Sequence, residues 1–362
     1  MGMRTVVEAI TGQRTRGTLE VAGTAVPWTD VHRQARLVAG RLAARGVRPG
    51  DRVALLGDTD VDLVTAIQAT WLAGAAVTVL PQPATDPAHL RRILGDARPR
   101  LVLTASPDRL PVADLANLAD LAATGPATGP LPDPPDPGDL AILQYTSGST
   151  RAPRGVPVKH AHLAANIDAI RAATDHDRIH RRTVSWLPLY HDMGLVGVLC
   201  TMMACGCDLV LVPTAEFAAR PLAWLDQLAA TRATMTAAPN FAWGLAARLL
   251  AATPTLDLSA VRVAVSGGEP IDPTTMTRFL AAAARHGFDP GALVCAYGLA
   301  EATLAVTMTR PGTGLRTDVV DPAGLERHSV AVPADGGRPL TRLGRPVAGT
   351  RVRIVNDTGE AG

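Results

Sequence analysis

Hydroxyl side chains gather directly after an apolar segment in the middle of the chain. Leu140 to Tyr145 has the composition of a strand. Five small residues follow it: Thr146, Ser147, Gly148, Ser149 and Thr150. Small residues let the backbone approach a ligand, and successive amides of such a turn can converge on an anion. Arg154 adds a planar, positively charged guanidinium group that can bind phosphate through two parallel hydrogen bonds. The stretch predicts a phosphate-binding loop, although it lacks the Gly-Lys-Ser/Thr order of the ordinary one; a hydroxyl-rich surface turn is the alternative.

A histidine and a carboxylate stand together after a second predicted strand. Tyr190, His191 and Asp192 follow the strand 183–185, and open α/β sheets bind ligands at the carboxyl ends of their strands. A His beside an Asp can be half of a hydrolase triad, but the sequence has no Gly-x-Ser-x-Gly nucleophile elbow. Hydrolysis is therefore the weaker interpretation. A core histidine is the structural alternative for His191.

Two further motifs follow strands with small residues. The strand 261–265 opens into Ser266, Gly267, Gly268, Glu269 and Pro270, and two glycines let a flat base lie against the backbone. The second motif, 295–303, contains Tyr297, whose ring can stack on a base, and Gly298, which leaves room for it. Glu301 carries a carboxylate of the kind that holds Mg²⁺. A bare Gly-Gly turn and a solvated carboxylate are the alternatives.

Together these motifs resemble the adenylate-forming superfamily, which joins a carboxylate to AMP using ATP. Gln144 before Tyr145, and Arg151 after Thr150, resemble the fatty acyl-AMP ligase branch. The resemblance implies catalytic roles for Arg154, His191 and Glu301, with Mg²⁺ on Glu301. It places ATP on Thr146, Ser147, Gly148, Ser149, Thr150, Gly267, Gly268, Glu269, Pro270, Ala296, Tyr297, Gly298 and Thr303. It places the acyl pocket at Tyr190, Asn240, Phe241, Trp243, Gly244 and Leu299; plain core positions are the alternative for Phe241 and Trp243.

The resemblance also implies an activity. A fatty or other long-chain carboxylic acid would be converted to acyl-AMP and pyrophosphate, then passed to the phosphopantetheine thiol of an acyl carrier protein in lipid or polyketide biosynthesis. An acyl-CoA ligase and a non-catalytic nucleotide-binding module are the alternatives. An amino-acid-activating domain would carry an Asp near 237–240, and Ala-Ala-Pro-Asn offers none.

The elements that must position these residues alternate between strands and helices. A helix from Thr29, with Thr29 as its cap, ends at Gly46; strands at 53–56 and 76–80 flank a helix at 61–72. This order predicts parallel sheets with covering helices. The expected fold is α/β: the large N-terminal domain of the adenylate-forming fold, with two doubly wound parallel sheets and the start of a small β-barrel subdomain. The expected divisions are 1–121, a Pro/Gly-rich linker at 122–138, 139–310 with the nucleotide site, and 311–362, where Leu325 and Glu326 lie in an insertion-like segment.

Lys159 is the only lysine of the chain. The superfamily uses a catalytic lysine from a small C-terminal domain, and Lys159 lies too close to the predicted phosphate loop to be that residue. Residues 350–355 read as an alternating strand before a turn that calls for a returning strand. We therefore expect an N-terminal portion without the C-terminal lid domain, which adenylates slowly alone.

Composition is consistent with a cytoplasmic, globular protein. The formal net charge is +2, so no nucleic-acid partner is implied. The N-terminus lacks a signal core, and the apolar run 195–207 is too short to span a bilayer and predicts a buried helix. The four cysteines are expected to be reduced, and neither they nor His176 and His180 complete a metal-ligand pattern.

Overall fold

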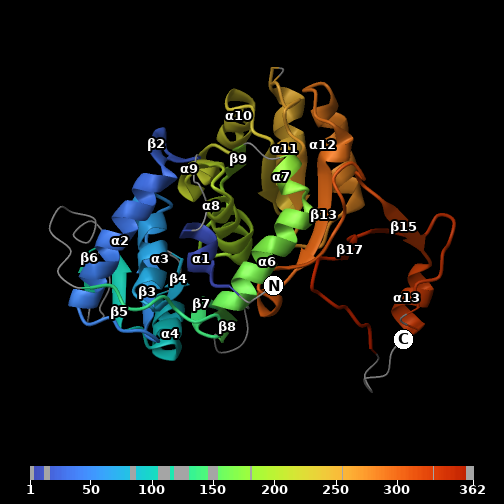
Figure 1. Cartoon of the computed structure of the whole chain (residues 1–362). Helices are drawn as coiled ribbons and strands as arrows, with labels where there is room; N and C mark the ends of the chain where they lie inside the picture. Colours follow the sequence, from blue (N-terminus) through green and yellow to red (C-terminus); the bar gives the residue numbers. More distant parts are fainter. Residues whose placement is uncertain are drawn as a thin grey trace. The chain divides into compact units, whose positions relative to one another are not determined.

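The computed structural model describes residues 4–11, 17–81, 87–104, 115–117, 130–145, 154–179, 182–254, 256–328 and 330–355 (Figure 1). The chain divides into two compact units. Unit 1 contains Met1–Ile167 and Arg181–Trp224, and unit 2 contains Asp168–His180 and Leu225–Gly362.

Unit 1 contains a sheet whose strands lie in the order β6-β5-β3-β4-β7-β8. Their bounds are β3 Arg52–Leu56, β4 Ala76–Val79, β5 Leu101–Thr104, β6 Leu115–Asn117, β7 Leu140–Tyr145 and β8 Gly155–Lys159. All neighbours are parallel except β7 and β8. Strands β4 and β5 are buried at every position. Their sequences are accordingly almost entirely apolar, as expected for strands of a sheet that is covered on both faces.

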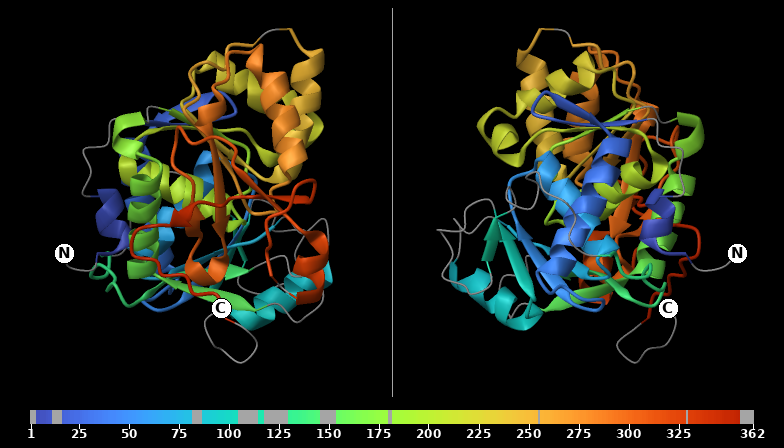
Figure 2. Two further views of the ribbon diagram at one scale, coloured as in Figure 1. Left: turned by 90° about the vertical axis from the view of Figure 1, so that its right-hand side faces the viewer. Right: turned by 60° about the vertical axis from the view of Figure 1, so that its left-hand side comes forward.

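Helices cover both faces of this sheet (Figure 2). The helices of this part of the chain are α1 Val6–Thr11, α2 Trp28–Ala44, α3 Val61–Leu72 and α4 Pro87–Ala97. Helix α3 packs against α2 and against β3 and β4. On the other face, Leu90, Ile93 and Leu94 of α4 form a core cluster with Ala54 and Leu56 of β3, which share one face by the alternation of a strand.

Two predicted helix boundaries can be compared with the structure. Thr29 does not cap its helix: α2 begins at Trp28, which is fully buried and donates its indole N–H to Cys207 O at 2.8 Å. After β8, whose pairing with β7 includes Val158 opposite Ile142, the chain forms the helix α6 His160–Ala173. The helix predicted at 61–72 is confirmed, and Asp60 caps it by accepting from Leu63 N–H at 2.7 Å.

The remaining strands of unit 1 lie in the order β2-β1-β10-β9. They are β1 Thr18–Val21, β2 Thr24–Pro27, β9 Arg182–Ser185 and β10 Asp208–Leu211. The hairpin β1–β2 is antiparallel, whereas β1, β10 and β9 are parallel. Helix α9 Thr214–Ala219 follows β10, and α10 Leu222–Ala230 continues across the division into unit 2.

The predicted buried helix at 195–207 is confirmed as buried, but its winding was not foreseen. It begins as the π-helix η2 Met193–Cys200 and continues as α8 Thr201–Cys205. Among the described residues, no helix has the length and apolar character needed to cross a membrane.

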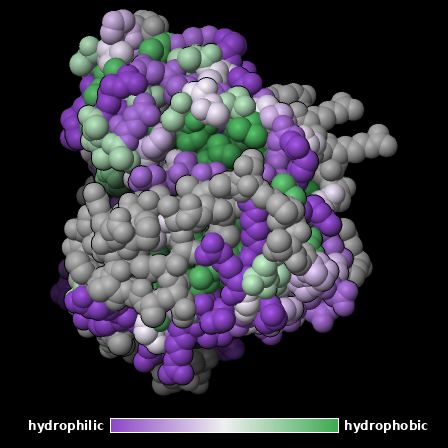
Figure 3. All heavy atoms as spheres, turned by 90° about the vertical axis from the view of Figure 1, so that its left-hand side faces the viewer, coloured by the Kyte–Doolittle hydropathy of each residue, from purple (hydrophilic) through white to green (hydrophobic). Residues whose placement is uncertain are grey.

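On the face drawn in Figure 3, hydrophilic side chains predominate among the described residues.

Unit 2 is built on the parallel strands β11 Met235–Ala238, β12 Val263–Ser266 and β13 Leu293–Gly298. Strands β14 Ala305–Met308 and β17 Arg345–Pro346 extend this sheet in antiparallel fashion. Helices α11 Asn240–Ala252 and α12 Pro273–Ala284 pack together. Short elements complete the unit: α7 His176–Ile179, η3 Pro290–Ala292, η4 Ala300–Ala302, α13 Pro322–His328, and the antiparallel pair β15 Thr317–Val320 and β16 Arg338–Thr341.

The strand predicted at 350–355 does not form. Residues 351–354 belong to no strand or helix, and Ile354 is 76% exposed. A strand needs a partner for its backbone groups, and the described residues supply none along this segment. The predicted α/β fold class is otherwise confirmed, with mainly parallel sheets, flanking helices and a small antiparallel sheet.

Candidate functional site

The predicted nucleoside residues of unit 2 meet at the carboxyl ends of two adjacent parallel strands. Ser266 at the end of β12 lies opposite Cys295 of β13. Gly267 is buried, and a Cβ there would lie 3.3 Å from Ala296 O. Gly268 has a φ of 76°, which favours glycine. Gly267 therefore lets the backbone after β12 approach that of β13 closely, and Gly268 permits the turn that follows.

Tyr297 and Gly298 end β13 beside this turn. Tyr297 is 48% exposed, so part of its side chain is open to solvent. A Cβ on Gly298 would collide with Leu304 O, the same oxygen that accepts from Leu299 N–H at 2.9 Å. The β13–β14 ladder shifts register between Tyr297 and Gly298. Glycine is thus required for the tight connection that leaves the tyrosine at the surface.

The connection between β13 and β14 also carries Glu301 and Thr303. Glu301 is exposed on η4, whereas Thr303 is only 6% exposed. Thr303 has a φ of 73°, a strained value for a β-branched residue and one that often marks a functional site. A single exposed carboxylate fits Mg²⁺, which binds through one or two carboxylates together with phosphate and water. Leu299 is half-buried in the same connection.

In unit 1, the Tyr190–His191 segment follows β9 and leads into η2. Tyr190 is 39% exposed. His191 Nδ1 lies 2.9 Å from Asp192 Oδ1, and the side chains of His191 and Asp192 are 44% and 13% exposed. Asp192 Oδ1 also accepts from Met193 N–H at 2.7 Å and so caps η2. The aspartate therefore joins the histidine to the start of the buried helix.

Gln144 has a structural role that sequence reasoning missed. Its side chain is 5% exposed, and its Nε2 donates to Tyr190 O at 2.8 Å and to Tyr145 O at 3.1 Å. The amide thus ties the end of β7, just before the predicted phosphate loop, to the Tyr190–His191 segment. The sequence alone marks Gln144 only by its resemblance to one family branch and does not indicate this hydrogen bonding.

Tyr145 is fixed beside it. Its hydroxyl donates to Asp96 Oδ2 at 2.6 Å. Burial, followed by this bond to a carboxylate, raises the pKa of Tyr145 above its usual value. Residues Thr146 to Thr150 and Arg151 lie outside the described residues, so their phosphate-binding role stays a prediction. Arg154 is described and exposed just before β8.

The predicted acyl-pocket residues of α11 divide into three environments. Trp243 is 1% exposed, donates its indole N–H to Ala238 O at 3.0 Å and packs against Phe279 with ring centroids 4.7 Å apart. Phe241 is 52% exposed. A Cβ on Gly244 would lie 3.2 Å from Thr275 Cγ2 of α12, so this glycine permits close helix packing. Their assignment to a pocket remains a prediction.

A reciprocal pair of hydrogen bonds joins α11 to the turn after β12. Glu269 Oε2 accepts from Phe241 N–H at 3.1 Å, and Asn240 Oδ1 accepts from Asp272 N–H at 3.0 Å. Pro270, between these two bonds, is exposed. The carboxylate of Glu269 supplies the cap that Pro239 cannot give to α11. Glu269 and Asn240 therefore position the turn that follows β12.

Comparison with known proteins gives the family. The sequence profile of the AMP-binding enzyme family matches residues 8–361. The chain belongs to this family. Among AMP-binding relatives, a long-chain-fatty-acid–AMP ligase of Mycobacterium marinum is 36% identical over 354 residues, which cover 91% of this chain and 60% of that protein. A long-chain-fatty-acid–AMP ligase of Mycolicibacterium smegmatis is 36% identical over 307 residues, 78% of this chain and 48% of that one.

Solved AMP-binding structures share the fold. The fatty acid AMP ligase from Legionella pneumophila matches with a TM-score of 0.89 and 28% identity, covering 98% of this chain and 65% of that chain. A fatty acyl-adenylate ligase of L. pneumophila in complex with acyl adenylate and pyrophosphate matches with a TM-score of 0.88 and 28% identity, covering 97% of this chain and 65% of that chain. The chain spans 60% to 64% of the lengths of three curated relatives.

Proposed function

We propose that the protein activates a fatty or other long-chain carboxylic acid with ATP, giving acyl-AMP and pyrophosphate. The observation that carries this proposal is the close approach of Gly267 to Ala296 at the ends of β12 and β13, beside the exposed side chain of Tyr297. A flat base would lie against this surface. Membership of the AMP-binding family and the names of the ligase relatives support it.

The reaction needs two anions held in line. A carboxylate oxygen attacks the α-phosphorus, a new P–O bond forms, and the bond to pyrophosphate breaks. Gly268 and Tyr297 would hold the nucleoside, and Thr303 would contact phosphate. Thr146 to Thr150 and Arg154 would hold the triphosphate, with His191 beside the carboxylate. Glu301 would hold Mg²⁺, which neutralises phosphate charge when bound. Positioning and electrostatic stabilisation account for the rate enhancement in this scheme.

A second step would transfer the acyl group to the phosphopantetheine thiol of an acyl carrier protein, with AMP as the leaving group. The choice of this acceptor over CoA rests on the resemblance of Gln144 and Arg151 to the fatty acyl-AMP ligase branch. Relatives are named both as AMP ligases and as CoA ligases, so their names leave the acceptor open. We infer that the 362 residues alone bind ATP but adenylate slowly, because they hold no candidate for the catalytic lysine that the resemblance implies. Their only lysine, Lys159, lies too close to the predicted phosphate loop to serve.

Pyrophosphate exchange with a panel of fatty acids tests the first step. We expect exchange with the full-length gene product and at least about 100-fold less with this chain, since effects of removing one charge-stabilising group reach this size. In the full-length protein, Tyr297→Ala should raise the KM for ATP, whereas Tyr190→Ala should leave it unchanged. Full exchange activity of the short chain would refute the inference about Lys159.

Product analysis distinguishes the alternatives. Acyl thioester formed with holo-carrier protein and not with CoA supports the proposal, whereas CoA thioester would make the enzyme an acyl-CoA ligase. Calorimetry with ATP addresses the non-catalytic alternative: ATP binding without exchange for any carboxylic acid would favour a binding module.

A further inference from the structure

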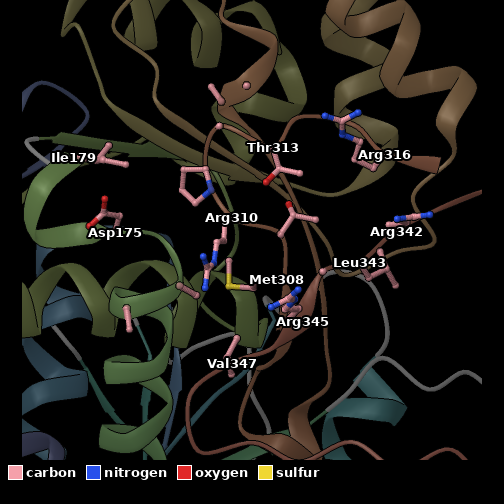
Figure 4. A pocket seen from close by; sticks show the side chains of 18 of the residues that line it. Asp175, Ile179, Met308, Arg310, Thr313, Arg316, Arg342, Leu343, Arg345 and Val347 are labelled. Carbon is pink, nitrogen blue, oxygen red and sulfur yellow. The ribbon is translucent and has the colours of Figure 1, made fainter. Parts of the chain in front are cut away.

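A wide groove lies within unit 2, apart from the turn that carries Gly268. Its volume is about 1410 Å³, and its lining comes from the end of α6, the segment after β14 and the segment around β17. Figure 4 shows Arg310 and Arg345 on either side of Met308, with Arg316 and Arg342 further along. The lining includes five arginines, since Arg262 also contributes, and two acidic residues, Asp175 and Asp289.

The strand register explains why two of these arginines are neighbours. Met308 of β14 pairs with Arg345 of β17, so both side chains leave the sheet on one face. Arg310 lies two residues beyond Met308, and Figure 4 shows its side chain beside that of Met308. Gly344 has a φ of 81°, and a Cβ there would collide with the Met308 backbone. This close approach fixes the segment that carries Arg345.

The arginines that line the groove are not neutralised by the two aspartates that line it. Asp175 pairs with Arg178 at 3.1 Å, and Asp289 Oδ1 accepts from Gly291 N–H at 2.8 Å. Arg342 is bound through Nε by both oxygens of Asp318, at 3.0 and 2.9 Å. Within the described ranges, the guanidinium groups of Arg310, Arg316 and Arg345 have no ion pair or hydrogen bond. Several guanidinium groups without a partner along one groove favour an anionic partner.

The shape of the groove selects the kind of anion. Its volume exceeds the roughly 300–1,000 Å³ of small-molecule pockets. A compact phosphate site would use converging free amides, but Gly312 N–H donates to Gly291 O at 2.8 Å and Thr313 N–H to Arg310 O at 3.1 Å. Separated guanidinium groups on an open surface suit carboxylates spaced along a chain.

We propose that this groove docks an acidic segment of a partner protein. Carboxylates of the segment pair with Arg310 and Arg345 beside Met308, and a further carboxylate reaches Arg316. The inference concerns a surface outside the proposed nucleotide site and does not depend on the proposed reaction.

Fluorescence anisotropy of this chain with a labelled polyglutamate peptide of about 16 residues tests the inference, at low salt because exposed charges are screened within about 10 Å at 0.1 M. The double variant Arg310→Glu with Arg345→Glu should bind at least about tenfold more weakly, and the corresponding Gln variant should weaken binding less. The matched control is the double variant Arg36→Glu with Arg248→Glu, which changes two exposed arginines of α2 and α11 outside the groove. This control changes the net charge by the same amount and should bind the peptide like the unmodified chain.

Three results would overturn the inference: no binding of the peptide at low salt, equal weakening in the control, or equal binding by the groove variants. Displacement of the peptide by an equimolar amount of inorganic pyrophosphate would also overturn it, since that outcome indicates a small-anion site. Thermal unfolding midpoints of all variants establish that each is folded before its affinity is compared.

Discussion

Thr303 combines burial with a backbone angle that its side chain disfavours. It is 6% exposed with a φ of 73°, in the short connection that also presents Glu301. Strain of this kind costs on the order of 1–3 kcal/mol and persists where the surrounding structure requires it. Here the connection joins β13 to β14 across the register shift at Gly298. This short connection constrains the backbone of Thr303 to the positive φ.

Thr303→Gly should therefore stabilise the chain, raising the free energy of unfolding in denaturant by about 1 kcal/mol. The same change should weaken ATP binding, because the proposed phosphate contact is lost. Thr317→Gly in the extended strand β15 is the control and should destabilise the chain. A loss of stability in Thr303→Gly as large as in the control would show that the threonine is not strained.

At the level of single residues, sequence reasoning identified motif members but not their supports. Glycines at 268 and 298 were expected to make room for a nucleotide, and positive φ at Gly268 and the contact at Gly298 give a physical reason for each. The bond from Gln144 to Tyr190 could not be read from the sequence, because it joins residues 46 positions apart.

At the scale of elements, the Tyr190–His191 segment is held from two directions. Gln144 donates to Tyr190 O at 2.8 Å. Gly194 of η2 packs against the backbone of Pro188, just before the segment, so closely that a Cβ at position 194 would collide with Pro188 O. The segment is thus placed by a buried hydrogen bond and by backbone contact.

Gln144→Leu should lower pyrophosphate exchange by the full-length protein about tenfold or more while changing the ATP dissociation constant little, because misplacement by about 1 Å can slow a reaction strongly. Gln68→Leu removes another buried amide of unit 1, which contacts His32 Nδ1 at 2.9 Å, and is the control for stability. If both variants lose stability equally and neither loses exchange activity, Gln144 has no positioning role.

Gly194→Ala should destabilise the chain by about 1–3 kcal/mol, the usual cost of forcing an extra carbon into a packed site. Gly95→Ala in α4 is the matched control, since nothing lies within 4 Å of a Cβ there. That change should be stabilising by up to about 1 kcal/mol, the helix preference of alanine over glycine. Chemical denaturation measures both, and a tolerated alanine at position 194 would contradict the packing argument.

Element types were predictable where periodicity was strong. Helix α3 and strand β3 lie within one residue of the ranges predicted at 61–72 and 53–56. Strand β8 was missed because its pairing with β7 is a tertiary contact. Residues 351–354 show the reverse case: they alternate in polarity but belong to no strand of the described part of the chain.

At the scale of the whole molecule, two buried histidines make stability depend on pH. Burial lowers the pKa of His160 in unit 1 and of His176 in unit 2 to about 4, from an ordinary value near 6.5. Between these values the unfolded chain binds more protons than the folded chain, so the free energy of unfolding falls as pH falls. More than about one pH unit above 6.5, both side chains are almost entirely neutral in either state and the effect becomes small.

We expect the unfolding midpoint in denaturant to decrease from pH 7 to pH 4.5, with each histidine contributing roughly 1–3 kcal/mol to the loss. His160→Leu should flatten part of this dependence. His162→Leu, at an exposed position on the same helix, is the control and should leave the slope as it is. An unchanged slope in His160→Leu would contradict the assignment.

The fold class and the family were predictable for the whole chain because the motifs recur at the ends of successive strands. Figure 1 shows these strands within their units. Thr146 to Thr150 of the predicted phosphate loop lie outside the described residues, so the geometry of this loop remains a prediction. The turn after β12 and the connection after β13 are described, and their contacts explain their conformations. The domain divisions proposed from composition likewise remain predictions.

The wide winding of Met193–Cys200 has a consequence for changes in chain length. A π-helix accommodates one residue more than an α-helix of the same span. Deleting one residue here would restore ordinary winding over the same span and leave the segments on either side in place. A one-residue deletion should therefore be tolerated better in Met193–Cys200 than in the α-helix α3, where it would rotate everything on one side by about 100° relative to the other.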